Sequence, residues 1–245
     1  MRKPVGGAFF GFMVGVALVG LLIAIGVPPT DRRSSAFSEV LKSKGRPAVE
    51  ENASEQLVNA WRNKLTGNYM VTSDFKRTAS DGREISQTSI SAKSGNDEVL
   101  VSGGDVTSTF DQKRLVCTAP NETAASAARS SCRGPVPVDP ANEDEQELAN
   151  VSNLVLGRGA RYLVTQRPDS CFEVRARQVA NSPAVALTAL QWGNSAVFCF
   201  DEQSGAVTSS RIFKDAAIDV STSKSIQNNI TRNDLEALVA RFTPR

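Results

Sequence analysis

The hydrophobic positions of the chain follow three patterns, and the first is an unbroken apolar run near the start. Residues 6–27, GGAFFGFMVGVALVGLLIAIGV, contain no charged side chain. As a helix this run would be about 33 Å long, enough to cross a hydrocarbon core of about 30 Å. We expect an uncleaved transmembrane helix here, after a short cytoplasmic tail at residues 1–5. The alternative is a cleaved signal peptide, whose apolar region is usually shorter.

The second pattern is the partial alternation of apolar and polar residues over short segments. Several such segments lie between residues 68 and 118, and turn sequences such as Asp81-Gly82 separate them. They predict an antiparallel meander of roughly four or five strands. Similar segments return after residue 160. Together they predict about ten strands in one curved antiparallel sheet, an incomplete β-barrel.

The third pattern has helical spacing. Leu57, Trp61 and Leu65 recur every four residues, which predicts a helix over residues 54–65. Residues 142–156 show a comparable apolar stripe, and a short helix is expected near the C-terminus. The fold class is therefore an N-terminal transmembrane helix followed by an α+β extracytoplasmic domain, with a curved antiparallel sheet and a few short helices.

Composition divides the remainder of the chain. Residues 28–50 mix Pro, Ser and charged residues, which is typical of a juxtamembrane linker. The β-rich domain is expected to occupy residues 51–245. Inside it, residues 119–141 are rich in Ala, Ser and Pro and predict a loop. Further secondary structure is expected at residues 38–44, as a short helix, and at residues 186–191, as a strand.

Charge and residue usage exclude several kinds of function. The formal net charge is +2 and histidine is absent. The near-neutral charge gives no reason to expect nucleic acid as a partner. Without histidine there can be no Ser-His-Asp triad and no His-containing zinc site. The chain also lacks a nucleophile elbow and a phosphate-binding loop. We therefore expect a protein that is not an enzyme and uses no metal or cofactor.

Acidic residues gather around the predicted second helix. They lack the spaced oxygen ligands and the glycine turn of a calcium loop, so they are interpreted as a loop and a favourable helix N-terminus. The cluster consists of Asp139, Glu143, Asp144, Glu145 and Glu147.

Four cysteines follow the apolar run, at Cys117, Cys132, Cys171 and Cys199. They are too far apart for the close pairs of a zinc knuckle, and an even number favours disulfides. Three connectivities are possible, and we expect the sequential pairing, which joins Cys171 and Cys199 across two strand-like segments. The alternative is four buried free thiols in a cytosolic domain.

Disulfides bear on which side of the membrane the domain lies. They form in oxidising compartments, so they place the large C-terminal domain outside the cytoplasm of a plasma (inner) membrane protein with a single span. The basic residues that follow the span favour the opposite orientation. Because long translocated domains tolerate such charges, we give more weight to the cysteines.

Three glycines repeat at four-residue spacing within the predicted span: Gly7, Gly11 and Gly15. Small residues at this spacing let two helices approach closely in lipid, which suggests a partner membrane helix. The alternative is that glycine is simply common in membrane helices.

Two segments bear a family resemblance. The run CFEVRAR, followed by FCFDEQSGAVTSSRI, resembles the second half of bacterial lipoprotein-carrier proteins of the LolA type and of the related anchored lipid-binding lipoproteins of mycobacteria. The helix at 54–65, followed by GNYMVTSDF, is similar to their opening. The resemblance covers residues 54–220 and implies an incomplete β-barrel with helices over an apolar cavity. The uncleaved anchor and the missing lipobox cysteine depart from the family and argue against shuttling between membranes.

These observations favour a membrane-anchored, non-catalytic extracytoplasmic protein that binds a lipid or another apolar ligand. Phe172, Phe198 and Phe200 are expected to line the cavity, because the two cysteine-bearing strands bring alternate positions together. The alternative is a protein-interaction or sensor module with the same fold and no ligand cavity.

Overall fold

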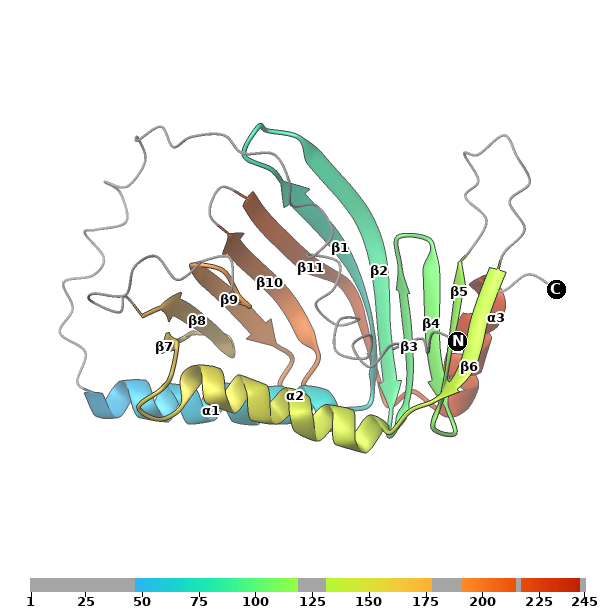
Figure 1. Ribbon diagram of the computed structural model, residues 1–245, viewed down its shortest axis with the longest axis horizontal. Coiled ribbons are helices and arrows are strands. Elements are labelled where there is room, and N and C mark those ends of the chain that lie inside the picture. Colours follow the sequence, from blue (N-terminus) through green and yellow to red (C-terminus); the bar gives the residue numbers. More distant parts are fainter. Residues whose placement is uncertain (1–46, 119–130, 178–190, 215–216, 243–245) are drawn as a thin grey trace, which may run out of the picture.

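The computed structural model describes residues 47–118, 131–177, 191–214 and 217–242. These residues form three helices and a single sheet of eleven strands (Figure 1). The helices are α1 (Pro47–Thr66), α2 (Pro140–Val155) and α3 (Arg232–Phe242). The strands of the N-terminal part are β1 (Tyr69–Thr78), β2 (Glu84–Ser94), β3 (Asp97–Ser102), β4 (Asp105–Phe110), β5 (Lys113–Thr118) and β6 (Ser131–Pro137). Those of the C-terminal part are β7 (Tyr162–Arg167), β8 (Cys171–Ala176), β9 (Ser195–Phe200), β10 (Val207–Lys214) and β11 (Ala217–Asn228).

The sheet is built from two meanders joined at its centre. Its strand order is β6-β5-β4-β3-β2-β1-β11-β10-β9-β8-β7, and all neighbours are antiparallel. The chain runs outward from β1 to the edge strand β6, crosses through α2, and returns from the edge strand β7 to β11. The first and last strands therefore pair, with Tyr69 opposite Asn228 and Thr78 opposite Ile218.

The span of α2 shows which face of the sheet is concave. This helix has 16 residues, so it is about 24 Å long. It packs against β7 and forms an ion pair with Arg114 on β5. In a flat sheet these strands, nine positions apart, would be separated by about 43 Å. The sheet must therefore curve toward α2, as Figure 1 shows, and the face that α2 covers is the concave face.

The two larger of three buried hydrophobic clusters lie on opposite faces of the sheet. On the concave face, α1 and α2 pack on strands β7 to β9 through residues that include Trp61, Val151 and Phe198. On the convex face, α3 packs on strands β2 to β4 through residues that include Leu235 and Leu238. Each terminal helix thus covers the meander that is distant from it in sequence.

The structure confirms the curved antiparallel sheet and its combination with a few helices. It differs at residues 119–141, which we expected to be a loop, because β6 and the first turn of α2 occupy part of this segment. Strand β6 is exposed along its whole length and contains Pro135 and Pro137, so it has no apolar alternation from which to predict it. Its pairing with β5 forms it instead.

Several expectations fall on residues outside the described ranges. These are the transmembrane helix at residues 6–27, the linker helix at 38–44 and the strand at 186–191. None of the helices in the described part of the chain is long and apolar enough to cross a membrane.

Candidate functional site

The three phenylalanines predicted to line a cavity lie in the concave-face core. Phe172, Phe198 and Phe200 are only 4–5% exposed. The ring of Phe198 lies 5.4 Å from that of Trp61 and 5.3 Å from that of Trp192, both nearly edge-on. The structure thus places these residues in a packed aromatic cluster beneath α1, and their role as cavity lining stays a prediction.

The polar groups of this aromatic cluster are satisfied internally. The Tyr162 hydroxyl donates a hydrogen bond to the Gly193 carbonyl oxygen at 3.1 Å and accepts one from the Trp192 backbone nitrogen at 2.9 Å. Burial raises the pKa of Tyr162 to about 12. The cluster is therefore a stable part of the scaffold, since none of these three polar groups is left without a partner.

Further along the concave face, apolar and charged side chains lie together and are only partly covered. Alternation along β1 puts Phe75 and Arg77 on the same face as the buried Tyr69. Ladder pairing brings Asp219 of β11 opposite Arg77, and Ile212 of β10 opposite Asp219. We call the half-buried group Phe75, Arg77, Ile212 and Lys214, with the buried Asp219 at its centre, the open concave patch.

An ion pair organises the open concave patch. The Arg77 guanidinium donates two hydrogen bonds to the Asp219 carboxylate, at 2.6 and 2.7 Å, and the Asp219 side chain is 4% exposed. Burial lowers the pKa of the neighbouring Lys214, Asp219 opposes this effect, and Arg77 adds to it. The patch therefore offers two cations, one of them paired, beside apolar surface, which suits an amphiphilic ligand with an anionic group.

A second group of cations lies beneath the N-terminal half of α2. Three carboxylates of this helix each pair with a cation from another element. The pairs are Arg114–Glu143 from β5, Lys93–Asp144 from β2 and Lys64–Glu147 from α1, with N–O distances of 2.5, 2.8 and 2.7 Å. We call Lys64, Lys93 and Arg114 the cation row, and Glu143, Asp144 and Glu147 the acidic half of α2.

The electrostatics of this region follow from its burial. Burial alone would raise the pKa of Glu147, but Lys64, Lys93 and hydrogen bonds from Lys64 and Trp61 outweigh it, so the pKa lies below its usual range. The Trp61 indole nitrogen donates its hydrogen bond at 2.7 Å. Burial also disfavours charged Lys64, yet Glu147 keeps the pKa of Lys64 above its ordinary value. Both groups are therefore ionised at neutral pH.

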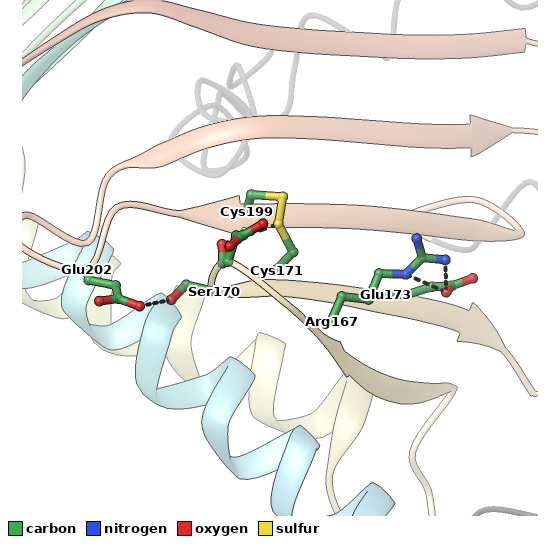
Figure 2. The surroundings of a disulfide bond; sticks show 7 residues. Arg167, Ser170, Cys171, Glu173, Cys199 and Glu202 are labelled. Carbon is green, nitrogen blue, oxygen red and sulfur yellow. Dashed lines mark hydrogen bonds and ion pairs between the residues drawn. A yellow bond between two sulfur atoms is a disulfide. The ribbon is translucent and has the colours of Figure 1, made fainter.

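The Cys171–Cys199 disulfide lies on the opposite, convex face, between β8 and β9 (Figure 2). Next to it, the Ser170 hydroxyl donates a hydrogen bond to Glu202 at 2.6 Å. Glu173, on the same side of β8, pairs with Arg167 and with Arg175. Burial raises the pKa of Glu173, but these two arginines outweigh it and keep the pKa below its usual range. Figure 2 shows Arg167 reaching Glu173 from the neighbouring strand.

The other disulfide, Cys117–Cys132, joins β5 to the exposed edge strand β6. Both disulfides follow the sequential pairing expected from the sequence. Each cross-links directly opposed residues of neighbouring strands. A zinc site and four free thiols are thereby excluded as interpretations of the cysteines.

The acidic turn after Cys199 is a tight hairpin between β9 and β10. Asp201 accepts hydrogen bonds from the backbone nitrogen and the hydroxyl of Ser204, at 2.8 and 2.7 Å. Gly205 has a φ of 72°, and a Cβ there would lie 2.4 Å from the carbonyl carbon of Asn63, so the position requires glycine. A polar pocket of 390 Å³ lies at this junction, and its amide and hydroxyl lining does not suit an apolar ligand.

No known family model matches the chain, and no curated protein matches it. Among solved structures, the chain is similar to one from the MucA/MucB complex of Pseudomonas aeruginosa, with 13% identity and a TM-score of 0.43. That match covers 75% of this chain and 60% of the other, so the chain spans less than two thirds of that protein.

Two further solved structures are similar to this chain. One is a LolA superfamily protein from Nitrosomonas europaea, with 8% identity, a TM-score of 0.30 and coverage of 77% of this chain and 97% of the other. The other is a DUF1329 family protein from Desulfovibrio piger, with 9% identity, a TM-score of 0.33 and coverage of 80% and 99%. One of these matches is thus to a protein of the LolA superfamily, the group that two segments of the sequence resemble.

The open concave patch and the cation row cannot be recognised in the sequence. Arg77 and Asp219 are 142 residues apart, and only the pairing of the first and last strands brings them together. Glu143, Asp144 and Glu147 were noticed as an acidic cluster, but their partners lie on three other elements. The one available indication was an unusual density of carboxylates on a helix with few apolar positions.

Proposed function

We propose that this chain is a non-catalytic, membrane-tethered protein whose domain outside the cytoplasm binds a lipid or another apolar ligand on the open concave patch. The supporting observation is that Phe75 and Ile212 are only half-buried on the concave face. They lie beside Lys214 and beside Arg77, which pairs with the buried Asp219. Apolar side chains with a few positioned charges are typical of ligand sites.

Two other features support the tether and the compartment. The apolar run at residues 6–27 has the length of a single membrane span. Two disulfides in a domain of this size fit an oxidising compartment, where such bonds persist. The ligand would then be met at or near the membrane surface, where apolar molecules are concentrated.

Native mass spectrometry of the full chain in a neutral detergent tests this proposal. We expect a lipid mass retained by the wild-type protein and reduced in Phe75→Ser, which removes apolar area from the open concave patch. Phe213→Ser is the matched control, because Phe213 is equally half-buried but lies on the convex face. Loss of the lipid in both variants, or a bare wild-type protein, would reject the patch as the site.

The second candidate function is a protein-interaction or sensor module without a ligand cavity. Its supporting observation is that Phe172, Phe198 and Phe200 are packed against other rings. A wild-type protein that retains no lipid but assembles with another membrane protein would favour this candidate.

A partner membrane helix at Gly7, Gly11 and Gly15 belongs to the same proposal. Exchanging Gly11 for Ile would block close approach of a second helix. We expect a smaller assembly in detergent, measured by light scattering. An assembly of unchanged mass would show that this glycine face is not used.

A further inference from the structure

We propose that the cation row, Lys64, Lys93 and Arg114, is a binding site for the anionic group of an amphiphilic ligand, and that the acidic half of α2 occupies this site when no ligand is bound. The anionic group is a phosphate or a carboxylate. This inference deepens the proposed function and rests on it, because the apolar part of the same ligand would lie on the open concave patch.

The cations of the cation row on the sheet are almost completely buried on its concave face. Lys93 and Arg114 stand on the concave face of β2 and β5, and their side chains are 6% and 13% exposed. Lys93 lies between Tyr69 on β1 and Glu98 on β3, and Arg114 also donates to the Thr109 hydroxyl at 3.2 Å. Without α2, these three cations and Glu98 leave a concave surface of net positive charge beside Tyr69.

The two halves of α2 make different kinds of contact with the rest of the domain. Its C-terminal half is fixed by the buried Val151 and Val155, which belong to the concave-face core. Between Ala141 and Glu147 no side chain is buried, and the contacts with other elements are the three ion pairs and the hydrogen bond from Trp61. At the start of the helix Pro140 is buried. If the acidic half leaves the sheet, Pro140 is the one buried side chain of this half that becomes exposed.

A ligand anion could replace the α2 carboxylates only if the buried cations stay paired. Burying a charged group is unfavourable unless a partner compensates it, so the cation row needs anions above it. Three carboxylates of α2 supply them in this structure. A ligand phosphate would supply up to about two negative charges and a ligand carboxylate about one, with hydrogen-bond acceptors of the same kind. Ligand binding would then replace ion pairs made by α2 with ion pairs made by the ligand, whereas replacing an apolar contact would leave a cavity.

The cation row and the open concave patch lie on the same face of the sheet. Lys93 lies opposite Tyr69, and Phe75 follows six residues later on β1, on the same face. At about 3.4 Å per residue this separation is about 20 Å along the strand. One ligand that contacts both places must have an extended apolar chain, so the class we infer is a long-chain lipid phosphate or fatty acid.

The test uses the full chain in a neutral maltoside detergent, with Trp192→Phe as the parent, so that Trp61 is the single tryptophan and reports on its hydrogen bond to Glu147. The probe is dodecyl phosphate, followed by Trp61 fluorescence. The triple variant E143Q/D144N/E147Q removes the competing carboxylates but keeps their size. We expect the triple variant to bind the probe about tenfold more tightly than the parent, because its neutral side chains no longer compete with the probe for the cation row.

The matched control is D74N/E84Q/E236Q, which makes the same change in net charge at exposed ion pairs. It should bind the probe as the parent does. In K93Q/R114Q we expect binding at least about tenfold weaker, since two of the three cations are gone. Far-ultraviolet circular dichroism establishes that each variant is folded.

Three outcomes would decide whether the cation row binds the anionic group of an amphiphile. A folded triple variant that binds no tighter than the matched control overturns the inference, and the proposed function stands if the wild type still retains lipid in native mass spectrometry. Inorganic phosphate binding as tightly as dodecyl phosphate would identify a free anion rather than an amphiphile as the ligand. Failure of every variant to bind either probe would reject the cation row as a site.

Discussion

The two halves of this sheet bury opposite faces, and the comparison explains where a ligand can bind. Strands β7 to β9 bury their concave face under α1 and α2, where Phe198 packs edge-on against Trp61 and Trp192. Strands β2 to β4 bury their convex face under α3. The concave face is therefore filled by rings in one half and carries buried ion pairs in the other, and our proposal assigns the ligand to the second half.

The largest expected effect tests the ring-filled half. Phe198→Ala should lower the free energy of unfolding by about 3–5 kcal/mol, because it leaves a cavity against Trp61 and Trp192. The control is Phe213→Ala on the half-buried convex surface, where the ring lies 5.2 Å from the Arg211 guanidinium carbon. Urea unfolding measures both. Equal losses would mean that the aromatic cluster is not the principal core of this half.

The disulfides give a comparison between the two halves. Replacing both Cys171 and Cys199 with serine opens the loop that this disulfide closes across a sequence separation of 28. The chain-entropy model predicts that the free energy of unfolding falls by about 3–4 kcal/mol. Removing Cys117–Cys132 in the same way should cost about 3 kcal/mol, because the loop is shorter at 15 residues.

The location of these two effects should also differ. Strand β6 is exposed along its length, so losing Cys117–Cys132 should speed amide hydrogen exchange in β5 and β6 and leave β7 to β9 protected. Losing Cys171–Cys199 should instead lower protection throughout the concave-face core. Exchange that rises equally everywhere in both variants would contradict this division.

The ion pairs of the other half predict a pH dependence. The pKa of Glu147 lies below its ordinary value of 4.5, so its ionised form stabilises the fold above that pH. This contribution is lost as the pH falls through the lower pKa of the folded state. Lys64, Lys93 and the Trp61 indole face this carboxylate. Wild-type stability should therefore fall by about 1–2 kcal/mol more than that of Glu147→Gln between pH 6 and acid denaturation.

The smallest expected effect comes from an exposed ion pair. Lys76 and Glu84 lie 2.7 Å apart, and both side chains are 50% exposed. Lys76→Gln should change the free energy of unfolding by less than about 0.5 kcal/mol, because water screens the pair. Thermal unfolding at two salt concentrations measures it, and a loss as large as that of Glu147→Gln would remove the distinction between buried and exposed pairs.

Local patterns predicted the elements that pack against a core. The spacing of Leu57, Trp61 and Leu65 predicted α1, and all three are buried in the structure. Cys171 and Cys199 predicted neighbouring strands correctly, because a disulfide requires their proximity. Helix α1 could be predicted because its apolar spacing is visible within a few turns of the sequence. The two strands could be predicted as neighbours because cysteine is rare in this chain.

What could not be predicted depends on pairings between distant segments. Nothing in the residues of β1 and β11 indicates that the two strands pair, so the Arg77–Asp219 ion pair had no local trace. Strand β6 was missed for a related reason, since pairing with β5 forms it and its own side chains are exposed. The candidate site is made of such long-range contacts, while the cores are made of periodic ones.

The exchange of terminal helices between the two meanders has a consequence for unfolding. Helix α1 begins the N-terminal meander but packs on the C-terminal one, and α3 does the reverse. Neither meander can therefore unfold alone without removing a helix from the other. The domain should melt in a single transition, with equal calorimetric and van 't Hoff enthalpies, and two fragments cut between β6 and α2 should be stable only when mixed.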